Sequence, residues 1–247
     1  MIATLVALVL AHVVADFVLQ TDRILANKRR PAGMALHVAI VGAVSWLALG
    51  LPLLPLPILL IVLGHAAIDA AKLRWGKPGF AAFAADQGAH LATIWIVAQL
   101  WPQTYAMGLW SAAAPVAALP GLARLPEAMA LGAGLIGTVW AGGFAVRELM
   151  SGLKLPADPE QDASLPKGGQ LIGRLERLMI LMLVLAAQPE GIGLLIAAKS
   201  ILRFGELARE ADRRASEYVI IGTLASFAWA IATSSATTAA LAALRTP

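Results

Sequence analysis

Long runs of apolar residues, each near the length of a membrane-spanning helix, constrain this chain more than any other feature. A helix that crosses a bilayer needs about 20 predominantly apolar residues. Hydrophobic residues make up 59% of the 247 residues and charged residues 14%, whereas soluble domains are roughly one quarter charged. An ordinary water-soluble globule and a disordered chain are therefore excluded. The sequence predicts an all-α, polytopic integral membrane helical bundle.

The apolar runs and the turn residues between them predict about eight membrane segments. We expect these at Ile2–Leu19, Met34–Leu49, Pro57–Ala71, Phe80–Leu100, Met129–Met150, Leu171–Ala187, Ile192–Phe204 and Tyr218–Leu241. Residues 1–104 are expected to form a four-helix unit, 105–128 an extracytoplasmic loop, and 129–247 a C-terminal helical unit with buried charges. The first run has no basic residues before it, so we expect a span there and not a cleaved signal peptide.

The positions of the Lys and Arg residues predict the topology. With alternating spans, all but two of the 19 cations lie on one face, and only Arg124 and Arg245 lie on the other. The positive-inside rule makes the basic face cytoplasmic, so both termini are expected to be extracytoplasmic. The net charge of +4 then indicates membrane lipids as partners, and no nucleic acid. The chain has no Cys, which excludes disulfides and thiolate metal sites.

All four histidines lie in the first 90 residues, and three of them stand four residues from an aspartate. The candidates are His12, Asp16, His37, His65, Asp69, Asp86 and His90. Residues i and i+4 share one helix face, and the alternating span directions place each aspartate nearer the cytoplasm than its histidine. Ionisable groups inside a membrane are costly and usually functional. We therefore expect these seven side chains to share one cavity.

The histidine spacing also predicts an internal repeat. His12 and His37 are 25 residues apart, and so are His65 and His90. Each interval holds the end of an inward helix, a basic loop and the start of an outward helix. This pattern predicts that the N-terminal unit consists of two similar hairpins, an arrangement known from other membrane proteins.

Imidazole and carboxylate groups together suit Zn²⁺, and also Mn²⁺ or Fe²⁺. Seven candidate ligands exceed the four of a structural zinc site, so the sequence predicts one or two divalent ions per chain. Facing histidines in a helical bundle can also ligate haem, but the three aspartates favour a harder ion. The alternative is a hydrogen-bonded cluster with a purely structural role.

The second half of the chain carries charges that should lie deep in the membrane. Lys199 follows the turn at 188–191 by eight residues, which at 1.5 Å per residue puts it about 12 Å inside. The acids Glu176, Glu206 and Glu217 are candidates for structural ion pairs with the neighbouring cations. The alternative is an anion-binding site made of Arg174, Arg177, Lys199 and Arg203, because Arg binds phosphate or carboxylate through two hydrogen bonds.

A specific motif set runs through the first 100 residues. It consists of His12-x-x-x-Asp16-Phe17-x-x-Gln20, Lys28, His37, His65-x-x-x-Asp69-x-x-Lys72 and Asp86-Gln87-x-x-His90. These motifs resemble the bacterial membrane protein family known as domain of unknown function 3307. Segments 173–177, 199–204 and 217–226 are similar to the C-terminal extension of its longer members. The resemblance implies a multi-pass protein of the bacterial inner (cytoplasmic) membrane, and it brings no activity with it.

Three functions are compatible with these observations. The first is a metal-dependent hydrolase near the cytoplasmic leaflet, with Asp16 or Asp86 as general base and an anionic lipid or lipid-linked phosphate as substrate. The second is a transporter of divalent cations or protons, which needs a polar route to the outside. Beyond the histidines the first four helices are almost wholly apolar, and this favours the enzyme. The third is a non-catalytic membrane assembly factor.

Overall fold

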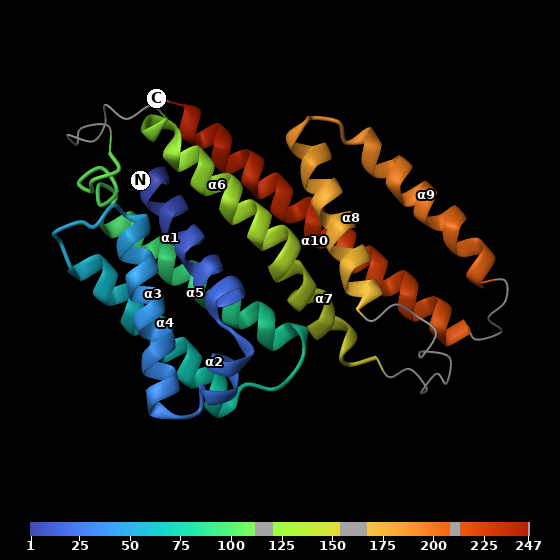
Figure 1. Cartoon of the computed structure of the whole chain (residues 1–247), viewed down its shortest axis with the longest axis horizontal. Coiled ribbons are helices and arrows are strands. Elements are labelled where there is room, and N and C mark those ends of the chain that lie inside the picture. The colour runs from blue at the N-terminus through green and yellow to red at the C-terminus, as the bar shows by residue number, and fades with distance from the viewer. Residues whose placement is uncertain (112–120, 154–166, 208–212, 247) are drawn as a thin grey trace. The chain divides into compact units, whose positions relative to one another are not determined.

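The computed structural model describes residues 1–111, 121–153, 167–207 and 213–246, with the backbone alone at 202–207, 213 and 215. Every regular element in these ranges is a helix (Figure 1). The elements are α1 (Ile2–Val14), the π-helix η1 (Ala15–Leu19), α2 (Asp22–Asn27), α3 (Pro31–Ala48), α4 (Leu56–Trp75), α5 (Phe80–Leu100), the 3₁₀-helix η3 (Leu122–Arg124), α6 (Leu125–Ile136), the π-helix η4 (Gly137–Ala141), α7 (Gly142–Met150), α8 (Gly168–Leu185), α9 (Glu190–Leu207) and α10 (Arg213–Arg245).

Five helical segments in the described residues are long and apolar enough to cross a membrane. They are Ile2–Leu19, Pro31–Ala48, Leu56–Trp75, Leu122–Met150 and Ser216–Arg245. The prediction of an all-helical membrane protein is thus confirmed, whereas the number of eight spans is not. Helices are present at all eight expected positions, but α5, α8 and α9 are not among the five. For α8 the reason is its three charged residues, Arg174, Glu176 and Arg177.

By its contacts the chain divides into two compact units, which are described separately below. Unit 1 comprises residues 1–136 and 239–247, and unit 2 comprises residues 137–238. The division therefore differs from the boundaries expected after residues 104 and 128, because α6 packs against α1. Of the predicted extracytoplasmic loop, residues 112–120 lie outside the described residues.

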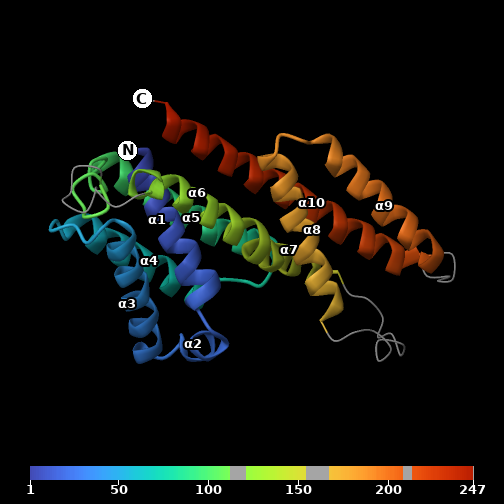
Figure 2. The same ribbon diagram turned by 45° about the horizontal axis from the view of Figure 1, so that its top comes forward.

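In unit 1 the helices α1, α3, α4 and α5 form a closed ring, in which each helix packs against two of the others (Figures 1 and 2). The ring is filled by buried side chains that include one from each helix, namely Leu8, Val41, Ile61 and Ile94. Each of these four residues lies four positions from a histidine and so shares its helix face. An apolar layer therefore packs directly beside the histidines.

The segment after α5 is bound to the ends of α1 and α3. The Thr4 hydroxyl donates to the Pro102 carbonyl (2.9 Å) and accepts from the Tyr105 amide (3.1 Å). The Leu109 amide donates to the carbonyl of Gly50 (2.7 Å). Gly50 has a φ of +81°, a conformation that favours glycine. These contacts fix the end of the ring that lies beside the N-terminus.

Unit 2 contains the hairpin of α8 and α9, whose helices run in opposite directions (Figures 1 and 2). Here a buried arginine is bound to the π-helix η4. The Arg177 guanidinium donates through Nε and Nη2 to the Val139 carbonyl (3.3 and 3.0 Å), and through Nη1 to the Ser226 hydroxyl (3.1 Å). A π-helix is a local departure from the α-helical hydrogen-bond pattern, and here its carbonyl oxygen accepts from a side chain.

Gly142 leaves the space that this arginine fills. A Cβ at Gly142 would lie 2.7 Å from Trp229 Cδ1 and 2.8 Å from Arg177 Cδ. We expect Gly142→Val to destabilise the protein by about 2–4 kcal/mol, since it overpacks the site and disrupts the arginine hydrogen bonds. A large decrease in melting temperature in detergent would show this. Gly137→Ala is the matched control, because a Cβ at Gly137 meets nothing within 4 Å. Equal melting temperatures for both variants would contradict the packing described here.

Candidate metal centre

The seven histidine and aspartate side chains meet inside the helix ring of unit 1. Two come from α1 and η1, one from α3, two from α4 and two from α5, namely His12, Asp16, His37, His65, Asp69, Asp86 and His90. Neighbouring imidazole rings lie 4.3 to 5.9 Å apart between centroids. His37 is fully buried and the Asp16 side chain, at 9% exposed, is the most accessible of the seven. The cluster is therefore a buried polar core made by four helices.

Four donor atoms from three of the helical segments converge most closely. His37 Nε2 lies 2.9 Å from His65 Nε2, 3.4 Å from Asp16 Oδ1 and 3.4 Å from Asp69 Oδ2. His65 Nε2 lies 3.5 Å from the same Asp16 oxygen and 3.3 Å from the same Asp69 oxygen. Of the three pairs within one helix, His65–Asp69 is as close as the contacts between helices, whereas His12–Asp16 and Asp86–His90 are looser, at 3.8 and 3.9 Å. One pair within α4 and its contacts with η1 and α3 thus define the centre.

This spacing fits a divalent ion. Ligands about 2.0–2.2 Å from a tetrahedral zinc lie about 3.3–3.6 Å from one another. The four distances from the two histidine nitrogens to the Asp16 and Asp69 oxygens fall within that range. In addition, Asp16 Oδ1 is buried and accepts no hydrogen bond in the described part of the chain. A buried carboxylate oxygen without a donor is costly, and a cation between the four donor atoms would remove that cost.

Two lysines border the cluster and neutralise part of its charge. Lys28, which follows α2, is buried and places its Nζ 2.6 Å from Asp69 Oδ2. Lys72, near the end of α4, places its Nζ 2.7 Å from Asp86 Oδ2, and its side chain is 46% exposed. Three carboxylates and two ammonium groups leave one net negative charge when the imidazoles are neutral. A cluster with this balance in a membrane helix bundle favours the binding of a further cation.

A chain of hydrogen bonds orients His12. The side-chain nitrogen of Gln87 donates to Asp86 Oδ2 (3.0 Å), so the Gln87 oxygen faces His12 Nε2 at 3.1 Å. His12 Nε2 must then carry the proton, and Nδ1 carries the lone pair. His12 Nδ1 is buried and has no hydrogen-bond partner among the described residues. The arrangement presents a basic nitrogen to the cluster.

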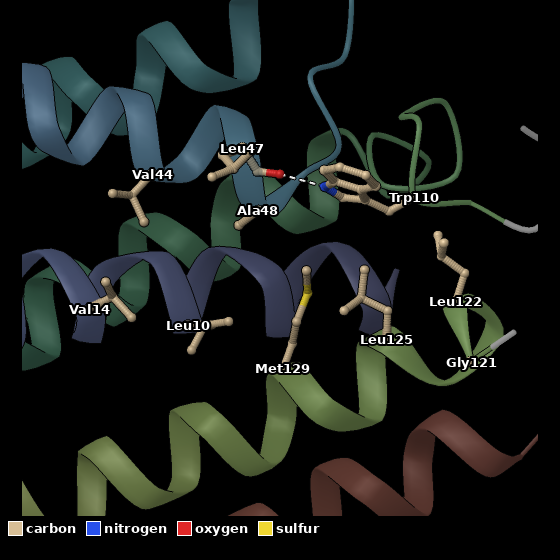
Figure 3. Close-up of a pocket in the computed structure, with 10 residues that line it drawn as sticks. All are labelled: Leu10, Val14, Val44, Leu47, Ala48, Trp110, Gly121, Leu122, Leu125 and Met129. Carbon is tan, nitrogen blue, oxygen red and sulfur yellow. Dashed lines mark hydrogen bonds between the residues drawn. The ribbon is translucent and has the colours of Figure 1, made fainter. Parts of the chain in front are cut away.

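The cavity beside the imidazole rings is small. It measures about 10 Å³ and is lined by His12, His65 and His90 together with Ser45 and Thr93, which is close to the minimum for one water molecule. A larger groove of about 590 Å³ lies between α1, α3 and α6 (Figure 3). Its α1 residues, Leu10 and Val14, are two positions from His12, on the opposite helix face. The groove is therefore apolar and separate from the metal centre.

In the second half of the chain, the expected structural ion pair forms at Glu176, which lies 2.7 Å from Lys199. Arg177, a candidate for anion binding, is arranged differently, because its donors are bound to the neutral Val139 carbonyl and Ser226 hydroxyl. Arg174 and Glu217 are exposed. The side chains of Arg203 and Glu206 lie outside the described residues.

Four further residues belong to the centre and were not assigned to it from the sequence. Lys28, Lys72 and Gln87 contact the aspartates or His12 as described above, and Gln20 Nε2 lies 3.5 Å from both ring nitrogens of His37. Each of them stands in the motif set of the first 100 residues. The topology analysis used the two lysines only as part of the Lys and Arg distribution. A lysine at a fixed place in a His/Asp motif also indicates a counter-ion for the aspartates.

Comparison with known proteins gives one match, to the N-terminal part of the chain. No curated protein and no solved structure matches the chain. The model of the family described as "Protein of unknown function (DUF3307)" matches residues 4–116, a range that contains all seven histidines and aspartates and both lysines. Residues 4–116 of the chain are thus a DUF3307 domain.

Proposed function

We propose that this chain is a membrane hydrolase that depends on a divalent ion, with Zn²⁺ preferred over Mn²⁺ or Fe²⁺. The ion is held by Asp16, His37, His65 and Asp69. The observation that carries the proposal is that His37 Nε2 and His65 Nε2 lie 2.9 Å apart and each lies 3.3 to 3.5 Å from one oxygen of Asp16 and one of Asp69. A bound divalent ion polarises a substrate oxygen and makes a bound water more acidic. The other side chains of the cluster then need only to position the substrate and to move a proton.

The proton acceptor in this proposal is His12 Nδ1. Asp16 is taken up by the ligand set, and Asp86 Oδ2 already accepts from Lys72 and Gln87. His12 Nδ1 carries an unpartnered lone pair, and Gln87 holds its other nitrogen in place. A base that is oriented by a third group is the arrangement typical of activated water or hydroxyl nucleophiles. His12 thus replaces the two aspartates as the proposed general base.

The proposed substrate is an anionic lipid or a lipid-linked phosphate. Lys28 and Lys72 lie beside the cluster, and Lys72 is exposed enough to meet an anionic group. From the Lys and Arg distribution we infer that this end of the spans faces the cytoplasm and both termini the other side, and from the family resemblance that the membrane is the bacterial inner membrane. The substrate would then approach from the inner leaflet, where anionic headgroups are abundant.

Turnover and its dependence on metal test this proposal. Purified protein loaded with Zn²⁺ is incubated with mixed micelles that contain phosphatidate, phosphatidylglycerol or an isoprenyl pyrophosphate, and the released water-soluble product is measured. We expect turnover of at least one of these substrates, its loss after chelation and its return with added Zn²⁺. Protein that retains stoichiometric metal and leaves all three substrates intact would overturn the hydrolase function.

A second function, divalent-cation transport, is favoured by one observation. The cavity at the imidazoles has room for about one water molecule, which suits an occluded ion better than a lipid headgroup. Its test is Zn²⁺ uptake into proteoliposomes. Uptake by the wild-type protein that is lost in His65→Ala, without any lipid hydrolysis, would place transport first.

A further inference from the structure

We propose that a second divalent ion binds beside the first, between Asp69, Asp86 and His90, with the Asp69 carboxylate shared by both ions. The inference rests on the proposed function, because it takes the first ion as given. Asp69 belongs to two groups of potential ligands, one with His37 and His65 and the other with Asp86 and His90. Within each group the ligand atoms lie within 4.8 Å of one another, and all five residues are buried.

His90 is oriented as a metal ligand. Its Nδ1 lies 2.9 Å from the backbone carbonyl of Asp86, which can only accept a hydrogen bond, so Nδ1 carries the proton and Nε2 the lone pair. His90 is 3% exposed, and its Nε2 has no hydrogen-bond partner among the described residues. Histidines that bind metals commonly donate their other nitrogen to a carbonyl in this way. The free lone pair points to a cation as its missing partner.

Asp86 is held in a similar manner. One of its oxygens, Oδ2, accepts from Lys72 Nζ at 2.7 Å and from the Gln87 side chain at 3.0 Å. The other oxygen, Oδ1, is buried and accepts no hydrogen bond in the described residues. Hydrogen bonds to one oxygen fix the orientation of a carboxylate, and the other is left for the ion. His90 and Asp86 thus present two unpartnered donor atoms from one turn of α5.

Two ions also specify the ligand that accompanies them. One divalent ion changes the net charge of the cluster from one negative to one positive, and a second raises it to three positive. Such an excess inside a membrane protein requires an anion. A pair of ions about 3.5–4 Å apart is the usual site for phosphoryl groups, so the accompanying ligand is a phosphate ester or inorganic phosphate. The second ion should therefore bind more tightly when phosphate is present.

Metal stoichiometry and magnetic coupling test the inference without any activity measurement. Protein in detergent is equilibrated with Mn²⁺, with and without inorganic phosphate, separated from free metal and analysed for ions per chain and by electron paramagnetic resonance. We expect two ions with a spin-coupled spectrum for the wild type, and one ion with an uncoupled spectrum for His90→Ala. Thr93→Ala, on the same helix and at the same small cavity, should keep two coupled ions.

The possible failures are distinguishable. One uncoupled ion in the wild type, unchanged in His90→Ala and by phosphate, would overturn the second site and leave the first intact. No bound ion in the wild type would overturn the proposed function itself. Asp86→Asn provides a second variant in case His90→Ala does not fold. It removes the charged ligand oxygen and keeps the shape of the side chain, and it too should retain one ion.

Discussion

Protein purified as His65→Ala should contain almost no bound zinc, whereas the wild type should retain it through gel filtration. His65 Nε2 lies 2.9 Å from His37 Nε2, 3.5 Å from Asp16 Oδ1 and 3.3 Å from Asp69 Oδ2. It also belongs to two of the three ligand groups of the cluster. Because loss of a residue that merely supports a ligand already costs about 10–100-fold in affinity, we expect more than 100-fold weaker binding here. Elemental analysis and a chelator competition titration measure it.

Ser45→Ala is the matched control for this variant. Ser45 is buried on α3 and lines the same small cavity as His65, but it belongs to none of the potential ligand groups. Its metal content should equal that of the wild type. Circular dichroism and gel filtration establish that both variants fold. A folded His65→Ala protein with a full equivalent of tightly bound zinc would refute the site assigned to the first ion.

His12→Gln should lower the kcat for substrate hydrolysis by about 10²–10⁴-fold, the usual contribution of a general base, and leave the zinc content unchanged. His12 takes no part in the four-atom ligand set, and its Nδ1 carries a buried lone pair without a partner among the described residues. Glutamine keeps a polar side chain of comparable length but offers no basic nitrogen. Measurement of kcat, KM and metal content on one preparation separates loss of the base from loss of the ion.

Gln87→Leu is the companion variant. Gln87 contacts His12 and Asp86 through its side chain, so its removal should disorient the base without removing it. We expect a smaller decrease in kcat, of about tenfold, the lower end of the range for residues that orient an active group. If His12→Gln turned over at the wild-type rate, or if it lost its zinc, the role assigned to His12 would be incorrect.

The apolar runs and the His–Asp spacing predict from the sequence alone that these side chains lie together inside a helical bundle. The i, i+4 rule places His12 over Asp16 and His65 over Asp69, and the structure brings these pairs together in one ring. The contacts that join the helices, however, are those of His37 with His65 and of both histidines with Asp16. These distances depend on how each helix is rotated about its axis, and residue spacing along one helix does not determine that rotation.

The parts that the sequence did not predict depend on the backbone. The short helix α2 shortens the basic loop and brings Lys28 into the cluster, where a purely topological interpretation leaves it on the membrane surface. In unit 2 the partner of Arg177 is a carbonyl oxygen of the π-helix η4. The sequence gives no sign of where an α-helix widens into a π-helix, so an acid seemed the natural partner for this cation.

The order of the helices in the ring has a consequence for biogenesis. The proposed ligands of the first ion come from η1, α3 and α4, whereas Asp86 and His90 belong to α5, which is synthesised last of the helices in the ring. Membrane helices are inserted first and associate afterwards. A nascent chain can therefore capture one ion before α5 leaves the ribosome, and it gains the remaining ligands only when α5 closes the ring against α1. Occupancy of the second position would thus report that integration of this unit is complete.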